Sequence, residues 1–303
     1  MGPRKKRVLI ITHYDADGIA SAAIVLKKHP DAEVAIAWAY NLAEKLNEVS
    51  GNPPDHIYIL DLPTSYPETR ELIGRLSKET KIDIINNVDH PVPKSASQLT
   101  SEKILHDQYL AMLGAQCDWI VDIPKYRADV ELLTFALRYK MADDDFKVRV
   151  ARKLAEGLKV DQIPEVVKEA HRGKKKFAEV LKIARKKEVH VTPIFSVIYM
   201  KETHGFGGLI AGEIISKEKK IVVVMRDANE KSKIALAPRS HRDIPIHIGE
   251  MVSKVCAQVG GRGGGHPHAA GGAIPSERRE EFIKLMAEYI EKKMKQGGGG
   301  GDR

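Results

Sequence analysis

Cysteine is scarce in this chain. Its 303 residues include only Cys117 and Cys256, too few for a disulfide framework or a cysteine-rich zinc site. Long apolar runs are also lacking, and none approaches the ~20 residues that a membrane-spanning helix needs. The basic segment Lys5–Arg7 leads into an apolar run too short for a secretory signal. We therefore expect a soluble, cytoplasmic protein with no membrane partner.

The content of charged and hydrophobic residues excludes further classes of protein. Hydrophobic residues make up 43% of the chain and charged residues 30%, which excludes a wholly disordered or collagen-like chain. Lysine and arginine total 49 against 41 aspartates and glutamates, a net charge of +8. An excess of this size favours a polyanionic partner, although ordinary basic enzymes also carry it.

The first third of the chain alternates β-branched apolar runs with stretches of helical periodicity. The runs predict strands buried on both faces of a parallel sheet, at Val8–Thr12, Val34–Trp38, Ile57–Leu60 and Ile82–Val88. Helices are expected between them, notably at Asn41–Val49 and Pro67–Lys78. We therefore expect an α/β fold with an N-terminal doubly wound, mainly parallel sheet. In such sheets ligands bind at the carboxyl ends of the strands.

The later sequence predicts a helical connector and a second, smaller α/β domain. Residues Leu132–Lys187 are poor in glycine and have helical composition. One strand is expected at Val191–Met200 and a glycine-rich loop at Gly260–Gly272. We expect a first domain with its connector at residues 1–185, a second domain at 190–296, and a disordered glycine tail at 297–303.

Carboxylates and histidines follow three of the expected strands. His13, Asp15 and Asp17 follow the first run, Asp61 the third, and Asp89-His90 the fourth. A single aspartate in such a place is often a helix cap, but several together repel unless a cation neutralises them. Oxygen and nitrogen donors without thiolate suit Mg²⁺ or Mn²⁺, and histidine favours Mn²⁺. Several carboxylates indicate two ions, which would polarise a phosphate and activate water for in-line attack.

These residues resemble the four motifs of the DHH phosphoesterases in order and spacing. The matching segments are His13-Tyr14-Asp15-Ala16-Asp17-Gly18, Asp61, Asp89-His90 and Leu113-Gly114-Ala115-Gln116-Cys117-Asp118. The resemblance implies a two-metal hydrolase, usually with Mn²⁺, whose ligands here are His13, Asp15, Asp17, Asp61, His90 and Asp118. It implies that Asp61 bridges the ions and that Asp17, Asp61 and His90 carry the catalytic roles. Pro91 replaces the second histidine of the motif that names the family, and Asp122 is a second candidate for the fourth motif.

The glycine-rich segment can bring backbone N–H groups close to an anion. It is not a Walker loop, because no Gly-Lys-Ser/Thr follows. Gly264-Gly265-His266 with Ala269-Ala270-Gly271 resembles the signature of the DHHA1 domain, and Arg239-Ser240 resembles its other substrate-binding element. The resemblance implies a substrate-binding set made of Arg239, Ser240, Arg262, Gly264, Gly265 and His266.

The sequence thus predicts a two-metal (Mn²⁺) phosphodiesterase or exonuclease. Its expected partners are single-stranded RNA or DNA, or short oligonucleotides as in the nanoRNase branch of the family. One alternative is a pAp phosphatase or cyclic dinucleotide phosphodiesterase, and another is a non-catalytic nucleic-acid-binding scaffold. A homo-oligomer is compatible with the sequence. Removal of Asp17 or Asp61 is expected to relieve charge repulsion and to leave the metal-free fold intact.

Overall fold

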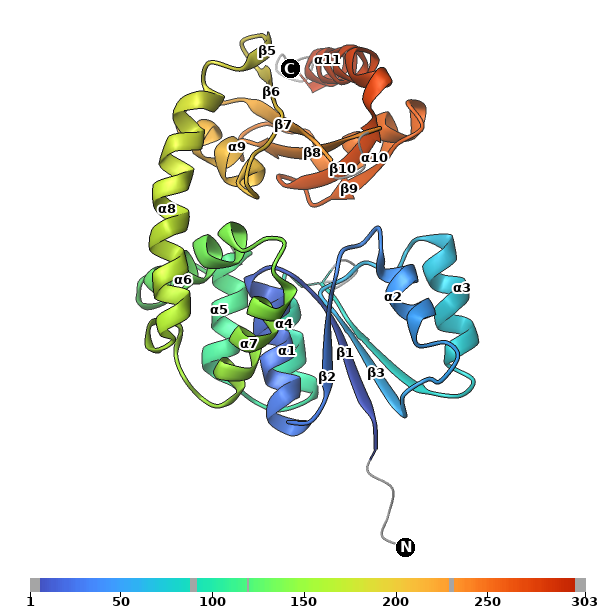
Figure 1. Ribbon diagram of the computed structural model, residues 1–303. Coiled ribbons are helices and arrows are strands. Elements are labelled where there is room, and N and C mark those ends of the chain that lie inside the picture. Colours follow the sequence, from blue (N-terminus) through green and yellow to red (C-terminus); the bar gives the residue numbers. More distant parts are fainter. Residues whose placement is uncertain (1–5, 88–91, 119, 229–231, 298–303) are drawn as a thin grey trace, which may run out of the picture. The chain divides into compact units, whose positions relative to one another are not determined.

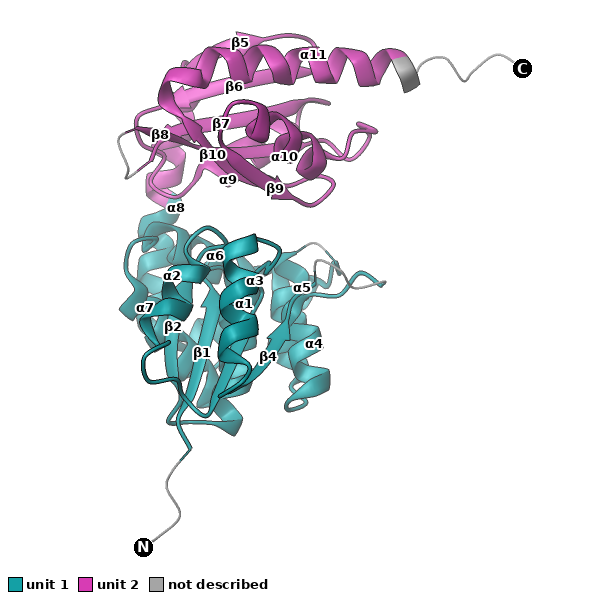
Figure 2. Cartoon of the chain, turned by 90° about the vertical axis from the view of Figure 1, so that its right-hand side faces the viewer, with its two compact units in different colours: residues 1–174 teal, residues 175–303 magenta. Residues whose placement is uncertain are grey.

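The chain forms two compact units. A computed structural model describes residues 6–87, 92–118, 120–228 and 232–297 (Figure 1). The units comprise residues 1–174 and 175–303 (Figure 2), and the division falls inside helix α8 (Pro164–Ala184). The domain limits of 185 and 190 stay a prediction, and the glycine tail lies outside the described residues from position 298 onward. Within the described ranges, no helix has both the length and the apolar character needed to cross a membrane.

Four parallel strands form the sheet of unit 1. They are β1 (Val8–His13), β2 (Glu33–Ala37), β3 (His56–Leu60) and β4 (Lys81–Ile85), in the order β2-β1-β3-β4. The chain runs from β1 to β2 on one side and then to β3 on the other side of β1. The winding direction therefore reverses between β1 and β3. The carboxyl ends of two such strands are where ligands bind in open α/β sheets.

Helices cover both faces of this sheet, so it is doubly wound as expected. One face packs, through Ile10 and Tyr58, against α1 (Ala16–Lys28), α4 (Ala96–Lys103), α5 (Gln108–Cys117), α6 (Pro124–Tyr139) and α7 (Asp144–Ala155). The other face packs, through Leu9, Ile11, Ile57 and Ile59, against α2 (Leu42–Glu48) and α3 (Pro67–Leu76). A 3₁₀ turn at Val160–Gln162 precedes α8. Alternate residues of each strand thus belong to two hydrophobic cores.

Unit 2 contains a six-stranded mixed sheet. Its order is β5-β6-β7-β8-β10-β9, with β6 and β7 parallel and the other neighbours antiparallel. The strands are β5 (Glu188–Val191), β6 (Phe195–Met200), β7 (Ile221–Asp227), β8 (Lys233–Ser240), β9 (Arg262–Gly265) and β10 (Ala270–Pro275). Its helices are α9 (Gly207–Ile215), α10 (Ile248–Gln258) and α11 (Arg279–Gly297), with a 3₁₀ turn at Ser276–Arg278. The core of this unit joins α10 and α11 to the sheet.

Two expectations for unit 2 are wrong. The single strand expected at Val191–Met200 is the antiparallel pair β5 and β6, because the Thr192 N–H donates to the Phe195 carbonyl (2.7 Å) and closes a turn. Pro193 lies inside this turn and has no N–H for a ladder. The glycine-rich loop is a β-hairpin, in which β9 pairs with β10. A Cβ on Gly272 would lie 2.9 Å from the Arg262 carbonyl oxygen, so this close pairing needs glycine.

Candidate metal centre

The corner between β1 and α1 positions the first group of side chains. Asp15 is the N-cap of α1, and its carboxylate accepts a hydrogen bond from the Gly18 N–H (3.1 Å). The Thr12 hydroxyl donates to the Gly18 carbonyl (2.7 Å) and closes the corner. A Cβ at Gly18 would lie 2.4 Å from the His13 carbonyl oxygen. Only glycine therefore fits where the helix starts this close to the strand.

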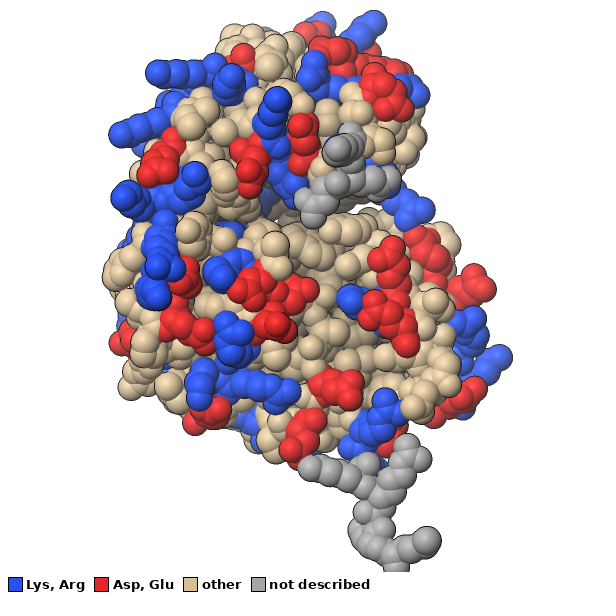
Figure 3. All heavy atoms as spheres, in the orientation of Figure 1, with Lys and Arg blue, Asp and Glu red and all other residues tan. Residues whose placement is uncertain are grey.

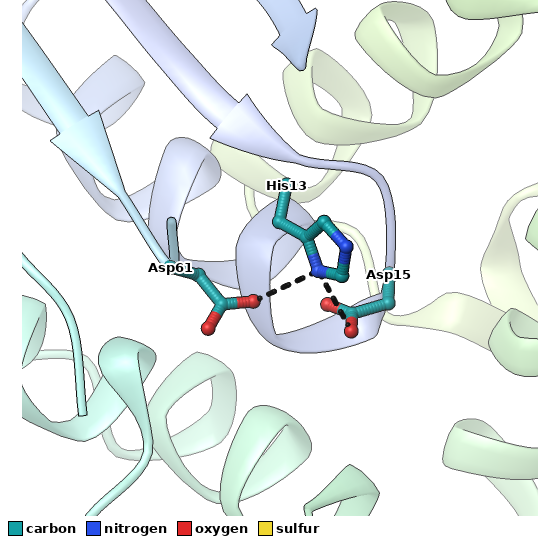
Figure 4. Close-up of side chains that lie close together, drawn as sticks. All are labelled: His13, Asp15 and Asp61. Carbon is teal, nitrogen blue, oxygen red and sulfur yellow. Dashed lines mark ion pairs between the residues drawn. The ribbon is translucent and has the colours of Figure 1, made fainter. Parts of the chain in front are cut away.

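His13, Asp15 and Asp61 converge at the carboxyl ends of β1 and β3. His13 Nδ1 lies 2.9 Å from an Asp15 carboxylate oxygen and 3.3 Å from an Asp61 oxygen, and both carboxylates point toward the ring (Figure 4). Their ligand atoms lie within 4.8 Å of one another. The three side chains are 25%, 22% and 12% exposed, so water or a substrate reaches them. The cluster therefore occupies the point where the winding of the sheet reverses.

The pKa values of this cluster reflect crowded acidic groups. Burial, together with repulsion from Asp15 and Asp17, raises the pKa of Asp61 well above its usual range. Burial alone lowers the pKa of His13, but the two neighbouring carboxylates outweigh it and raise this pKa well above its ordinary value. Burial opposes ionisation of Asp15, but His13 outweighs it and lowers the pKa of Asp15. The cluster thus binds positive charge, as a proton on His13 or as a cation.

Asp17 is placed differently from the other acidic residues. It is 0% exposed, and its carboxylate accepts hydrogen bonds from the N–H groups of Ala96 (2.7 Å) and Ser97 (2.9 Å) in the first turn of α4. A Cβ on Gly114 of α5 would lie 2.0 Å from an Asp17 oxygen. Burial, with repulsion from Asp15, raises the pKa of Asp17 against these hydrogen bonds. Asp17 therefore links α1 to α4 and α5.

Asp118 lies at the C-terminal end of α5. Its carboxylate accepts a hydrogen bond from the Asn87 side chain (3.1 Å), and burial, with repulsion from Asp17, Asp61 and Asp15, raises its pKa well above the usual range. Asp122 is 63% exposed and paired with Arg127. The ligand role expected for Asp118 stays a prediction, which the repulsion from Asp17, Asp61 and Asp15 supports.

Asp89, His90 and Pro91 lie outside the described residues. The ligand role expected for His90 therefore stays a prediction.

The side chains of the centre suit a divalent cation. Two carboxylates and one imidazole offer oxygen and nitrogen donors without thiolate, the donor set that Mn²⁺ accepts and that Mg²⁺ accepts less readily. A cation would also neutralise the repulsion that raises the pKa values of Asp61 and Asp118. His13, Asp15 and Asp61 thus form one candidate cation-binding group. The carboxylates of Asp17 and Asp118 are close enough to repel those of Asp15 and Asp61.

Arg138 is a residue of this region that the sequence did not reveal. It belongs to α6, donates a hydrogen bond to the Tyr14 hydroxyl (2.8 Å), and lies with its guanidinium 5.2 Å from the centre of the Tyr14 ring. Burial opposes its charge, but Tyr14 and Asp15 outweigh this and raise its pKa. It is therefore a fixed positive charge beside the centre. No motif or spacing marks it, because it lies far from β1 along the chain.

The predicted substrate-binding residues of unit 2 lie mostly on β8, β9 and the β9–β10 turn. Arg239 on β8 donates to the Ala270 carbonyl (3.1 Å), and the Ser240 hydroxyl lies 3.1 Å from His268 Nδ1. The following residues of the set are Gly264 and Gly265 on β9, and His266, whose N–H donates to the Ala269 carbonyl (2.7 Å). Arg262 begins β9, at the opposite end of that strand from Gly265, and is exposed. Arg239, Ser240, Gly265 and His266 thus all contact residues 268–270, and the substrate-binding role of the set stays a prediction.

Comparison with known proteins identifies both halves of the architecture. The family model of the DHHA1 domain matches residues 207–292. RecJ from Thermus thermophilus in complex with Mn²⁺ is similar over 95% of this chain and 52% of that chain, with 17% identity and a TM-score of 0.66. The chain has the DHH/DHHA1 fold. This finding confirms the resemblance and the fold class inferred from the sequence.

A second solved structure agrees with this fold, and two curated proteins are similar to parts of the sequence. The pGpG-specific phosphodiesterase PggH from Vibrio cholerae is similar over 95% of this chain and 99% of that chain, with 15% identity and a TM-score of 0.58. Among curated proteins, an alanine–tRNA ligase of Korarchaeum cryptofilum is 22% identical over 135 residues, and an uncharacterized protein of Methanocaldococcus jannaschii is 26% identical over 76 residues. These matches span 15% and 23% of the length of the two curated relatives.

Proposed function

We propose that this chain is a metal-dependent phosphoesterase that hydrolyses phosphodiester bonds in single-stranded nucleic acid or short oligonucleotides. Its proposed cofactor is a pair of Mn²⁺ ions, with Mg²⁺ as a substitute. The observation that carries this proposal is the convergence of His13, Asp15 and Asp61 at the winding reversal of the sheet. RecJ, which has the same fold, is described as an exonuclease and was solved with Mn²⁺ and with Mg²⁺.

Different residues of the chain would bind the metal and position its ligands. A divalent cation at this centre supplies Lewis-acid polarisation of a phosphoryl oxygen and a more acidic water. His13, Asp15 and Asp61 would hold it, and the proton between His13 and the two carboxylates would leave as it binds. Asp17 holds the β1–α1 corner against α4 and thereby fixes the position of Asp15. The catalytic roles of Asp17, Asp61 and His90 and the metal roles of Asp17, His90 and Asp118 are part of this proposal.

The second unit would supply substrate contacts. We assign this role to Arg239, Ser240, Arg262, Gly264, Gly265 and His266. Arg239 and Arg262 carry the fixed positive charges that a phosphate needs. The backbone of β9 is open to close approach because three of its four residues are glycine.

The net charge of +8 supports a phosphate-bearing partner, but basic side chains do not dominate the face shown in Figure 3. Lys and Arg side chains follow α8 in Figure 3, but Asp and Glu are interspersed among them on this face. Several of the basic residues are paired, as Lys174 is with Glu131 (2.9 Å) and Arg172 with Glu169 (2.9 Å). We therefore favour short strands over long duplexes as substrates, because long-range charge attraction would be modest.

A small substrate is the second candidate. PggH, described as specific for pGpG, is similar over 99% of its length, and a RecJ described as an exonuclease is similar over 90% of its length. The likeness to PggH supports a dinucleotide as an alternative substrate, with pAp and cyclic dinucleotides as related alternatives. A non-catalytic nucleic-acid-binding scaffold is the alternative of another class.

The test is a time course of hydrolysis with Mn²⁺, with Mg²⁺ and with EDTA. The substrates are labelled single-stranded RNA and DNA, dinucleotides, pAp and cyclic dinucleotides. We expect metal-dependent release of nucleotides, and a loss of at least about a hundredfold in kcat/KM for Asp61→Asn, because a metal ligand supports several kcal/mol of transition-state stabilisation. Absence of hydrolysis on every substrate, or full activity of Asp61→Asn, would leave the scaffold as the better account.

A further inference from the structure

A row of three aromatic rings, those of Tyr14, Trp38 and Tyr40, begins beside His13 of the candidate metal centre. The Tyr14 ring lies 4.4 Å from the His13 ring and 4.0 Å from Trp38, measured between ring centres. The Trp38 ring lies 6.1 Å from His13 and 6.0 Å from Tyr40, and is nearly parallel to Tyr40, with 23° between the planes. We call Tyr14, Trp38 and Tyr40 the aromatic ladder.

The inner part of the ladder is fixed by packing. Tyr14 is 7% exposed and is held by the hydrogen bond and the cation–π contact from Arg138. Trp38 follows β2 and packs against the core shared by α1 and α5. These two rings therefore have an ordinary structural role as well, which is to close the core next to His13.

The outer part differs, because Tyr40 is 68% exposed. Its loop is nevertheless held in place: the Trp38 N–H donates to the Asn41 side-chain oxygen (2.7 Å), and the Asn41 N–H donates to the Trp38 carbonyl (3.1 Å). These two reciprocal bonds close the turn that carries Tyr40 before α2 begins. A rigid, exposed ring loses little conformational entropy when a ligand stacks on it.

We propose that Tyr40, supported by Trp38, is a stacking platform for a nucleobase of the substrate. This proposal rests on the proposed function, because the ladder begins at His13 of the metal centre. Aromatic faces stack on any base, and such stacking tolerates sequence. A phosphodiester held at His13, Asp15 and Asp61 would place a neighbouring base over the carboxyl end of β2. The platform therefore favours unpaired nucleotides over base-free phosphate compounds and over paired bases, whose faces are covered by their neighbours.

The experiment compares Tyr40→Ala with Tyr40→Phe, which keeps the ring. Tyr139→Ala is the matched control, since Tyr139 is also exposed in unit 1 (38%) but lies outside the ladder. Binding of a fluorescein-labelled single-stranded trinucleotide, and of the same trinucleotide without bases, is measured by anisotropy with Ca²⁺ in place of Mn²⁺, so that a divalent cation is present at the carboxylates. Hydrolysis of both ligands is then measured with Mn²⁺.

We expect Tyr40→Ala to weaken binding of the trinucleotide by roughly five- to a hundredfold, the range found when one aromatic–base stack is removed. Tyr40→Phe and Tyr139→Ala should bind like the wild type, and the base-free ligand should not distinguish the variants. Equal binding of the trinucleotide by the wild type and Tyr40→Ala would overturn the platform, as would equal wild-type binding of the two ligands. The wild type could hydrolyse neither ligand while Tyr40→Ala still weakened binding of the trinucleotide. In that case the proposed function fails and the platform stands.

Discussion

The hydrogen bonds of Asp17 reverse one expectation drawn from the sequence. An acidic residue beside other acids should be removable without loss of stability in the metal-free protein. In the structure its carboxylate accepts two backbone N–H bonds from Ala96 and Ser97, and all three residues are 0% exposed. We therefore predict that Asp17→Ala destabilises the metal-free protein.

The size of the effect follows from the groups left behind. Asp17→Ala leaves two buried N–H donors without an acceptor, each costing about 1–3 kcal/mol. Relief of the repulsion between Asp17 and Asp15, which contributes to the raised pKa of Asp17, offsets part of this loss. We expect a net loss of about 2–4 kcal/mol in the free energy of unfolding. In a unit of this size that corresponds to a fall in Tm of ~5–15 °C.

The assay is thermal unfolding in EDTA, followed by circular dichroism. Asp17→Asn keeps one acceptor oxygen and should fall between the wild type and Asp17→Ala. Asp145→Ala removes an exposed carboxylate from the first turn of α7 and should change stability by less than about 1 kcal/mol. A Tm for Asp17→Ala within about 2 °C of the wild type would refute the reasoning, because the two N–H groups would then have found other partners.

Other predictions concern packing, pH and thiol reactivity. Gly114→Ala should lower the free energy of unfolding by at least about 1–3 kcal/mol in chemical denaturation, because its Cβ would collide with Asp17; Gly74→Ala on α3, with nothing within 4 Å, should not lower it. Without metal, the free energy of unfolding should fall as pH rises above about 4: burial and the neighbouring carboxylates raise the pKa of Asp61, so the stability that its proton gives is complete below the unfolded pKa of 3.8 and is lost as pH rises through the folded pKa. Asp61→Asn should flatten that slope, and an unchanged slope would contradict the assignment. Burial raises the pKa of Cys256 to about 12, so this thiol should react with DTNB at pH 8 far more slowly in the native protein than in urea, and equal rates would show that the site is open.

The meeting of His13, Asp15 and Asp61 could be predicted from the sequence. Each residue follows a short β-branched run, and parallel strands present their carboxyl ends at one edge of a sheet. The pattern is local, because each strand and the residues after it lie within a few positions of one another. The four strands of unit 1 follow from the same local signals, whereas the choice of Asp118 over Asp122 came from the spacing of the family motif and stays a prediction.

The contacts of Asp17 could not be predicted in this way. Its partners Ala96 and Ser97 lie about eighty positions later in the chain, and only the tertiary packing of α1 against α4 brings them together. The position of Arg138 could not be predicted either, because its partner Tyr14 lies 124 positions earlier in the chain. The hairpin of β9 and β10 was missed because glycine is depleted in strands, whereas here tight pairing requires it.

Asp61 has a backbone conformation with its own consequence. Its φ is 57°, in the left-handed region that costs an L-residue ~1–2 kcal/mol and that aspartate and asparagine tolerate better than most. Asp61→Gly would remove this strain together with a half-buried carboxylate whose pKa is raised. At position 61, glycine thus favours thermal stability, whereas aspartate favours metal binding. A library screened only for resistance to heat should enrich glycine at position 61, and the variants that it returns should have lost their response to Mn²⁺.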